Sequence, residues 1–415
     1  MRVKQGLAVM LLLLVGVLAA CGGKQEPSSA GGQAGQAKEQ VLKIGAAVSL
    51  TGALSAEGKY VRDGYDFWRD TVNKNGGIKI GDQQYKVEII YYDDQSNSDT
   101  ASKLTEKLIT EDGVKFILGP FGSGISSAAT TISEKYQVIN IPPMASSDKV
   151  YARGYKYLFG ILPLSSTNLN PIFDMLKIMS PAPRTVAIIT PDDLLPLTVA
   201  EAAREYATSV GMEVVLYEKY PKDAKDFSAL VSQVKAKNPD VWVGTGYMND
   251  AVAQIRQAKE LKFNPTAVVF PVPTALPQFT ETLGADALNV IGSDWWTKDM
   301  AWTGPVFGSA KDYYDGFRAA KGYEPNYNVA GSSAAGLVLQ LALEKAGTLD
   351  VNRVRDVLAA TNTETFFGPI KYDSRGVNTA ATVSVIQIQG GKPVLIWPEK
   401  IQKAKPVFPK PLWGN

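Results

Sequence analysis

Segments typical of short β-strands alternate with segments of helical periodicity, starting at Val41. Strands are predicted at 41–50, 86–92, 114–119 and 138–141, and helices around 61–72, after Ser98-Asp99, and over 126–135. Gly76-Gly77 mark the end of the first helix. A chain that alternates β and α in this way folds into a parallel sheet with helices on both faces.

A second series of the same kind begins near Ser165. Its helices are predicted at 168–179, 198–210, 227–237 and 250–261, and its strands at 185–190, 213–217, 241–244 and 267–270. We therefore expect an α/β protein with two doubly wound, Rossmann-like lobes. Helices at 309–321, 330–346 and 351–360 are expected to return to the first lobe, and the strand-rich end to the second.

These returns imply several connections between the lobes, which together form a multi-strand hinge. We expect the connections near 160–165, 291–295 and 361–366. The predicted first lobe comprises 41–162 and 292–363, the second 163–291 and 364–400, and a tail follows over 401–415.

The N-terminal residues predict export. Arg2 and Lys4 precede an apolar run from Leu7 to Ala20 that is short for a membrane span and typical of a signal peptide. The sequence Leu-Ala-Ala-Cys, ending at Cys21, resembles a bacterial lipobox, which implies cleavage after residue 20 and lipidation of the cysteine. An ordinary signal peptide with a chance cysteine is the alternative. The Gly-, Ser- and Gln-rich stretch over 21–40 is expected to be a flexible tether.

Composition excludes several classes of function. Cys21 is the one cysteine and histidine is absent, so histidine-activated nucleophiles, the usual histidine zinc sites and disulfides in the mature chain are excluded. The 43 Lys and Arg residues nearly balance 41 Asp and Glu residues, without a basic block that would track nucleic acid. We expect a binding protein, without catalytic residues, metal or cofactor.

Loops beyond the carboxyl ends of parallel strands are the places where such folds bind ligands. One loop, 49–58, follows the first strand, and a second delivers Ser123 to the start of a helix, where backbone N–H groups favour a carboxylate. A third contains Ala145 and Ser146. From the second lobe, Tyr247 follows the strand around Trp242.

Each of these features has a structural alternative. The Gly-rich segment before Ser123 is also typical of a tight strand-to-helix turn, and it lacks the spacing of a nucleotide-binding loop. Ser146-Ser147 could serve only to cap a helix. The aromatic pair Trp295-Trp296 favours core or interface packing over a ligand wall.

Residues 41–400 resemble the substrate-binding proteins of branched-chain amino acid ABC transporters, which have the type I periplasmic-binding fold. Single segments are weak evidence, but their order along the chain is specific. The segments that carry the resemblance are SLTGALSAEG, NKNGGI, YYDDQSNSDTA, FILGPFGSG, IPPMASSDKVYARGY, KDFSALVSQVKAKNPDVWVGTGY and FFGPIKYDSRG.

The resemblance implies roles for particular residues. Ser123, Ala145 and Ser146 would hold the α-carboxylate of the ligand, and Tyr247 would close over it from the second lobe. Glu57 falls near the position of the family's side-chain pocket, although a solvated loop carboxylate is its alternative role.

Two departures leave the ligand open. Val272 stands about where leucine-type members carry a glutamate for the ammonium group, and Leu195-Pro196 replaces an expected aromatic-glycine pair. An unpaired ammonium in a closed cleft would be costly. Either another acid takes over, with Glu57, Asp193 and Asp250 as candidates, or the ligand has no ammonium.

The resemblance implies an extracytoplasmic, lipid-anchored and monomeric protein that delivers a small carboxylate to the permease subunits of an ABC importer. The expected ligand is an amino acid, branched-chain or otherwise hydrophobic. The alternatives are an aromatic or aliphatic acid without an ammonium group, or a ligand-sensing receptor or regulator with the same fold. The sequence does not specify the ligand or the type of cell envelope.

Overall fold

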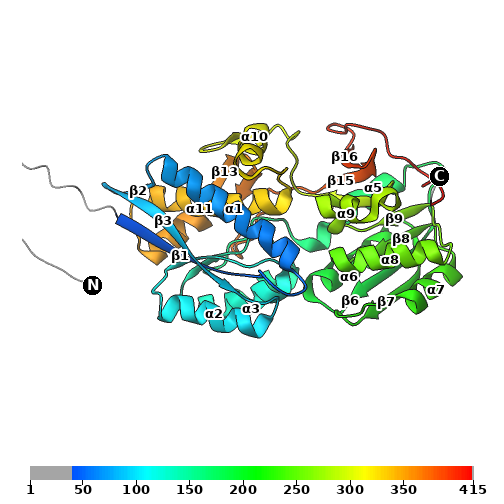
Figure 1. Cartoon of the computed structure of the whole chain (residues 1–415), viewed down its shortest axis with the longest axis horizontal. Coiled ribbons are helices and arrows are strands. Elements are labelled where there is room, and N and C mark those ends of the chain that lie inside the picture. Colours follow the sequence, from blue (N-terminus) through cyan, green and yellow to red (C-terminus); the bar gives the residue numbers. More distant parts are fainter. Residues whose placement is uncertain (1–39, 414–415) are drawn as a thin grey trace, which may run out of the picture. The chain divides into compact units, whose positions relative to one another are not determined.

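The computed structural model describes residues 40–413, whose two main sheets are each flanked by helices (Figure 1). The predicted signal peptide, Cys21 and the tether as far as residue 39 lie outside the described residues. Within 40–413, no helix has both the length and the apolarity that crossing a membrane would require.

The first sheet has five strands in the order β2-β3-β1-β4-β5. These are β1 (Gln40–Val48), β2 (Ile78–Ile80), β3 (Gln83–Asp93), β4 (Phe116–Leu118) and β5 (Ile139–Ile141). All neighbours pair in parallel except the short β2, which runs antiparallel to β3. Helices α1 (Ser55–Lys74) and α11 (Tyr327–Ala346) cover one face, and α2 (Ser98–Thr110) and α3 (Ser123–Lys135) cover the other (Figure 1).

The second sheet has seven strands in the order β16-β15-β10-β9-β8-β6-β7. These are β6 (Thr185–Pro191), β7 (Glu213–Tyr220), β8 (Val241–Gly244), β9 (Ala267–Val269), β10 (Ile291–Asp294), β15 (Ser384–Gln389) and β16 (Lys392–Trp397). The strands from β6 to β10 pair in parallel, and the two terminal strands add an antiparallel edge. Its flanking helices are α5 (Asn170–Leu176), α6 (Leu194–Ser209), α7 (Ser228–Lys237), α8 (Met248–Glu260) and α9 (Pro277–Leu283).

The remaining elements complete the predicted returns of the chain. Helix α11 packs against α1, and β15 and β16 join the second sheet, so the expected α/β class is confirmed. The other elements are α4 (Asp148–Tyr151), α10 (Ala310–Lys321), α12 (Val351–Ala359), and the strand pairs β11 (Thr303–Gly304) with β12 (Gly308–Ser309) and β13 (Asn362–Thr365) with β14 (Gly368–Lys371).

The central strands are apolar on both faces because helices cover both faces. On β6, Val186 and Ile188 pack in the cluster that includes α5 and α6, whereas Ala187 and Ile189 pack in the cluster that includes α7 and α8. This alternation follows from the two-residue period of a strand. It explains why these segments are continuous hydrophobic runs in the sequence.

Some helix starts differ from the predictions. Helix α6 begins at Leu194 and not at 198, because Pro196 lies in the first turn, where its missing N–H costs no hydrogen bond. Helix α3 begins at Ser123 and not at 126. The cap of α2 is Asn97, whose side chain accepts the Thr100 N–H, and not Ser98-Asp99.

Two of the segments that connect the sheets, around 160–161 and 376–378, lie side by side. Gly160 N–H donates to the Gly376 carbonyl (2.8 Å), and Asn378 Nδ2 donates to the Ile161 carbonyl (2.9 Å). Phe366, between β13 and β14, stacks on Tyr313 of α10 with ring centroids 4.0 Å apart. The hairpin of β13 and β14 therefore packs on α10. The lobe boundaries themselves stay a prediction.

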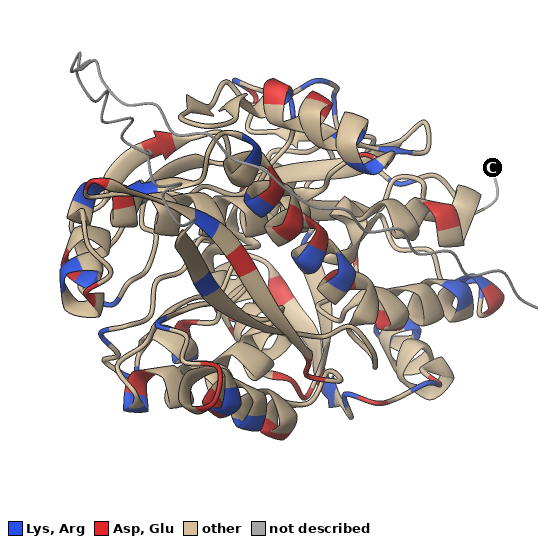
Figure 2. Cartoon of the chain, turned by 60° about the vertical axis from the view of Figure 1, so that its left-hand side comes forward, with Lys and Arg blue, Asp and Glu red and all other residues tan. Residues whose placement is uncertain are grey.

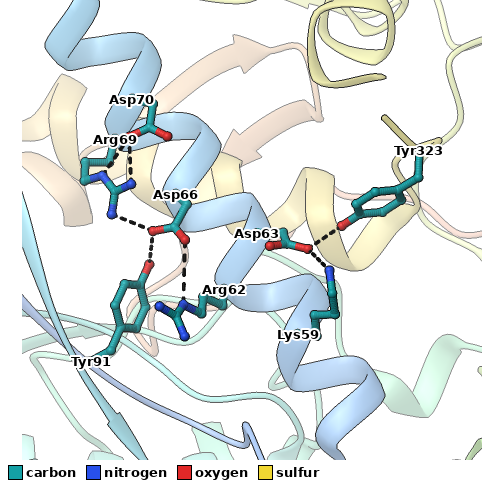
Figure 3. A network of polar contacts seen from close by, with 8 residues as sticks. All are labelled: Lys59, Arg62, Asp63, Asp66, Arg69, Asp70, Tyr91 and Tyr323. Carbon is teal, nitrogen blue, oxygen red and sulfur yellow. Dashed lines mark hydrogen bonds and ion pairs between the residues drawn. The ribbon is translucent and has the colours of Figure 1, made fainter. Parts of the chain in front are cut away.

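Polar contacts hold α1 in place (Figure 3). Asp66 accepts hydrogen bonds from Arg69 (2.6 Å) and from the Tyr91 hydroxyl of β3 (2.9 Å). One turn earlier, Asp63 pairs with Lys59 and accepts a hydrogen bond from the Tyr323 hydroxyl (2.7 Å). These contacts tie α1 both to the sheet and to the segment before α11.

Charged residues of both signs are interspersed along the outer helices (Figure 2). Several form pairs one turn apart, such as Lys59 with Asp63 and Lys311 with Asp315. This arrangement agrees with the near-balance of charge in the sequence.

Candidate functional site

The loops after β4 and β5 meet through Ser123. This residue is fully buried at the first position of α3, and its Oγ accepts the backbone N–H groups of Ser146 (3.1 Å) and Ser147 (3.0 Å). The structure therefore brings Ser123 and Ser146 together. Both loops follow parallel strands that are neighbours in the sheet, which is why residues 23 positions apart can touch.

Ala145 lies in the same loop, and its side chain is completely buried. Its carbonyl accepts a hydrogen bond from the Tyr151 hydroxyl of α4 (2.7 Å). The backbone of the loop is therefore fixed from the side of α4 as well as from Ser123.

A narrow cavity, with room for about one water molecule (about 10 Å³), lies between the two lobes, next to this loop. Its walls come from both lobes and from the connections, and most of them are apolar. The lining residues are Phe121, Met144, Ser146, Leu162, Asn168, Leu195, Val272, Trp295 and Tyr327. The lining, polar at the Ser146 loop and apolar elsewhere, suits a small ligand with a polar end and an apolar body, and the lobes have to move apart to admit one.

The lobes touch each other at the edge of this cavity. The ring of Tyr247, at the start of α8, lies edge-on to the ring of Phe121, with centroids 6.0 Å apart. The hydroxyls of Ser147 and Thr198 form a hydrogen bond of 2.6 Å from one lobe to the other. Tyr247 thus closes against the first lobe, although it does not itself line the cavity.

Three carboxylates lie around Tyr247. Burial raises the pKa of Glu57 to about 7, with a further rise from Asp250. Burial also raises the pKa of Asp250 to about 6, and it raises the pKa of Asp193 against the opposing effect of Lys222. Burial places the pKa of Tyr247 well above its usual value, and all three acids raise it further. None of these carboxylates forms an ion pair within residues 40–413.

The alternative role of Glu57 as a solvated loop carboxylate is wrong. Glu57 lies in the first turn of α1 and is 1% exposed. The cause is the next residue: a Cβ on Gly58 would lie 1.8 Å from the Ser49 carbonyl, so the helix packs directly on the end of β1. This close approach carries Glu57 inward.

The two departures from the family pattern both lie in the cavity wall. Val272 and Leu195 are nearly buried there, and each presents an apolar side chain. The position expected to hold a glutamate is therefore a hydrophobic surface. The candidate acids Glu57, Asp193 and Asp250 lie around Tyr247.

The aromatic pair divides between two environments. Trp295 lines the cavity and packs on Tyr327, with ring centroids 4.7 Å apart. Trp296 is in the core, where its Nε1 donates to the Phe366 carbonyl (3.0 Å) and its ring contacts Tyr313. The predicted core role thus describes Trp296, whereas Trp295 is part of a cavity wall.

Several cavity residues were not identified from the sequence. Asn168 and Leu162 come from the first connection, and Tyr327 comes from the start of α11, far from any strand end. Phe121 and Met144 lie inside loops whose serines were identified. For Asn168, the one signal in the sequence was its position close to the connection predicted at 160–165.

The chain was compared with known proteins. Residues 41–392 match the periplasmic binding protein family. A Leu/Ile/Val-binding protein homolog 8 from Brucella abortus is 28% identical over 389 residues, covering 89% of this chain and 93% of the relative. A leucine-, isoleucine-, valine-, threonine- and alanine-binding protein from Pseudomonas aeruginosa is 26% identical over 338 residues, covering 81% of this chain and 86% of that protein.

Solved structures agree on the fold. The branched-chain amino acid transporter substrate-binding protein LivJ from Streptococcus pneumoniae, in complex with isoleucine, has a TM-score of 0.77 and 25% identity, over 86% of this chain and all of that one. A solute-binding protein from R. palustris in complex with benzoate has a TM-score of 0.74 at 16% identity, over 88% of this chain and 99% of that chain.

These matches span both lobes and the connections between them. They agree with the two mostly parallel sheets and with a cavity lined from both sides. The chain therefore belongs to the periplasmic binding protein family of type I fold, as a non-enzymatic, extracytoplasmic solute-binding protein distantly related to the Leu/Ile/Val-binding proteins.

Proposed function

We propose that this protein captures a small carboxylate, with a hydrophobic amino acid as the first candidate, and delivers it to the permease of an ABC importer. The observation that carries the proposal is the cavity between the lobes, which has Ser146 in its wall and Ser123 hydrogen-bonded to the Ser146 N–H. The names of the relatives support the ligand class: the Pseudomonas aeruginosa protein is named for five amino acids, and the Streptococcus pneumoniae structure contains isoleucine.

The carboxylate end of the ligand would lie against the start of α3. There, free N–H groups and the helix dipole favour a negative charge. Ser123 accepts two hydrogen bonds from the next loop, and in residues 40–413 its own hydroxyl proton has no acceptor. That proton is available to a carboxylate oxygen, while the Ala145 N–H and the Ser146 hydroxyl would provide contacts from the adjoining loop.

The ammonium end would lie toward Tyr247 and the carboxylates of Glu57, Asp193 and Asp250. A cation would relieve the repulsion among these acids, which have no ion-pair partner in the described chain. The apolar wall at Val272 and Leu195 supports a second candidate, an aromatic or aliphatic acid without an ammonium group.

The partners follow from the family and from the N-terminal motif. We propose that Cys21 carries lipid, that this anchor holds a monomer at the outer face of the cell membrane or facing the periplasm, and that the permease subunits receive the ligand. Genes for a permease and an ATPase beside the gene of this protein would favour import over a receptor or regulator role.

Isothermal titration calorimetry of residues 41–415 tests the ligand class. Leucine is compared with 4-methyl-2-oxopentanoate, and phenylalanine with phenylacetate and benzoate. Tighter binding of the amino acids supports the acid cluster as the ammonium partner. Equal or tighter binding of the compounds without an ammonium group supports the second candidate, and binding of none of them contradicts the proposal.

A further inference from the structure

One polar side chain in the cavity wall has no partner for its acceptor. Asn168 is 2% exposed and lines the cavity, and its Oδ1 is buried without a hydrogen bond among residues 40–413. The other lining side chains are mostly hydrocarbon or aromatic. An unpaired buried amide is costly, so a partner for it inside the cavity would be favoured.

The backbone of Asn168 is held in place. Its N–H donates to the Ser165 carbonyl (3.1 Å), and its own carbonyl accepts the Ser293 hydroxyl of β10 (3.3 Å). The residue is therefore fixed between the first connection and the second sheet. A side chain on a fixed backbone can select a ligand by geometry, because little has to move when the ligand binds.

We infer that Asn168 determines specificity by hydrogen bonding to a second polar group of the ligand, a hydroxyl or amine near its apolar body. This inference rests on the proposed function. Ser146 lies on the wall from the first lobe and Asn168 follows the connection into the second. A ligand that carries both a carboxylate and a donor group would engage both, whereas an acid with a plain hydrocarbon body would leave the amide unpaired.

Sites built to hydrogen-bond a polar group reject analogues that lack it much more strongly than apolar pockets reject an extra methylene. We therefore expect wild-type protein to bind the donor-bearing acid of a matched pair at least about tenfold more tightly. This preference for the donor-bearing acid should depend on the Asn168 amide and should be lost when the amide is replaced.

The experiment combines variants with matched ligands. Wild type, Asn168→Leu and Asn168→Asp are titrated by calorimetry with 4-methylpentanoate, 2-hydroxy-4-methylpentanoate and leucine. These ligands share one hydrocarbon body and differ in a hydrogen, a hydroxyl or an amine. Asn75→Ala is the control, because Asn75 is exposed at the end of α1, outside the cavity. Thermal unfolding of each variant shows whether it is folded.

The expected result is a wild-type preference for 2-hydroxy-4-methylpentanoate over 4-methylpentanoate that falls to about onefold in Asn168→Leu and is unchanged in Asn75→Ala. The preference for leucine should persist in Asn168→Leu, because the acids around Tyr247 are the proposed partners of its ammonium group. In Asn168→Asp the preference should shift toward leucine, since a carboxylate attracts its ammonium. Asn168→Asp also tests the inference if Asn168→Leu does not fold. An unchanged preference in every folded Asn168 variant overturns the inference, even if the acids bind. Failure of wild type to bind any of the three overturns the proposed ligand class instead.

Discussion

Replacing Glu57 by glutamine should make the stability of this protein less dependent on pH. The carboxylate is buried in the first turn of α1, and burial raises its pKa from 4.5 to about 7. Because the folded protein binds this proton more tightly than the unfolded chain, the stabilising effect is complete below pH 4.5 and is lost as the pH rises through 7. Glutamine keeps the shape of the protonated acid and has no charge to lose.

The size of the effect follows from these two pKa values. Between about pH 5.5 and about pH 8, proton linkage at one such group lowers the free energy of unfolding by about 2 kcal/mol. Asp250 and Asp294 have pKa values raised in the same direction, and they are present in both proteins. The quantity that isolates Glu57 is therefore the difference between wild type and variant at each pH.

Urea denaturation of residues 41–415 at the two pH values measures this difference. Wild type should lose about 2 kcal/mol more than Glu57→Gln over the interval. Glu88→Gln is the matched control, since Glu88 is exposed on β3 and its replacement should leave the wild-type pH dependence in place. Equal losses in wild type and Glu57→Gln would refute the reasoning, because they would mean that the carboxylate is solvated or paired.

Three further changes test other parts of the molecule. Ser123→Ala removes the acceptor of two buried N–H groups, so urea denaturation should show that the free energy of unfolding falls by about 1–3 kcal/mol. Ser127→Ala, in the same helix, is the control and should change it little. Calorimetry should also show that Ser123→Ala binds leucine more weakly than wild type. Gly336→Ala would place a Cβ 2.3 Å from the Trp68 ring. The overpacking should cost about 1–3 kcal/mol of stability, which exceeds the gain in helix propensity, so the melting temperature should fall. An unchanged melting temperature would contradict this contact. Cys21→Ser should move the full-length protein from the membrane fraction to the soluble fraction, and retention after a salt wash would count against lipid anchoring.

The fold could be predicted from the sequence because its signals are local. Strands such as β6 and β8 are continuous apolar runs, and the helices between them show a 3.6-residue period. The predictions were wrong at element boundaries and for very short elements. The helix predicted from 198 begins at Leu194, because proline is tolerated in the first turn and Pro196 can lie inside the helix. The three-residue strand β2 was missed, since its antiparallel pairing with β3 gives no pattern long enough to detect.

The site was predictable only where it depends on strand ends. Ser123 and Ser146 follow neighbouring parallel strands, so topology alone brings their loops together. Asn168 and Tyr327 reach the cavity from a connection and from a helix start, and their position depends on how the two lobes close. The burial of Glu57 depends on a contact of Gly58 with the Ser49 carbonyl, which no periodicity reveals.

The distribution of polarity around the cavity links ligand binding to the contact between the lobes. The first lobe offers the loop with Ser146, and the second offers Leu195 and Val272, while Tyr247 and Thr198 contact the first lobe beside the cavity. A ligand between these walls would contact both of them only when the lobes lie close together. A ligand shifts such an equilibrium only by its difference in affinity for the two states. An acid too small to reach the second wall should therefore bind weakly and leave the hinge open.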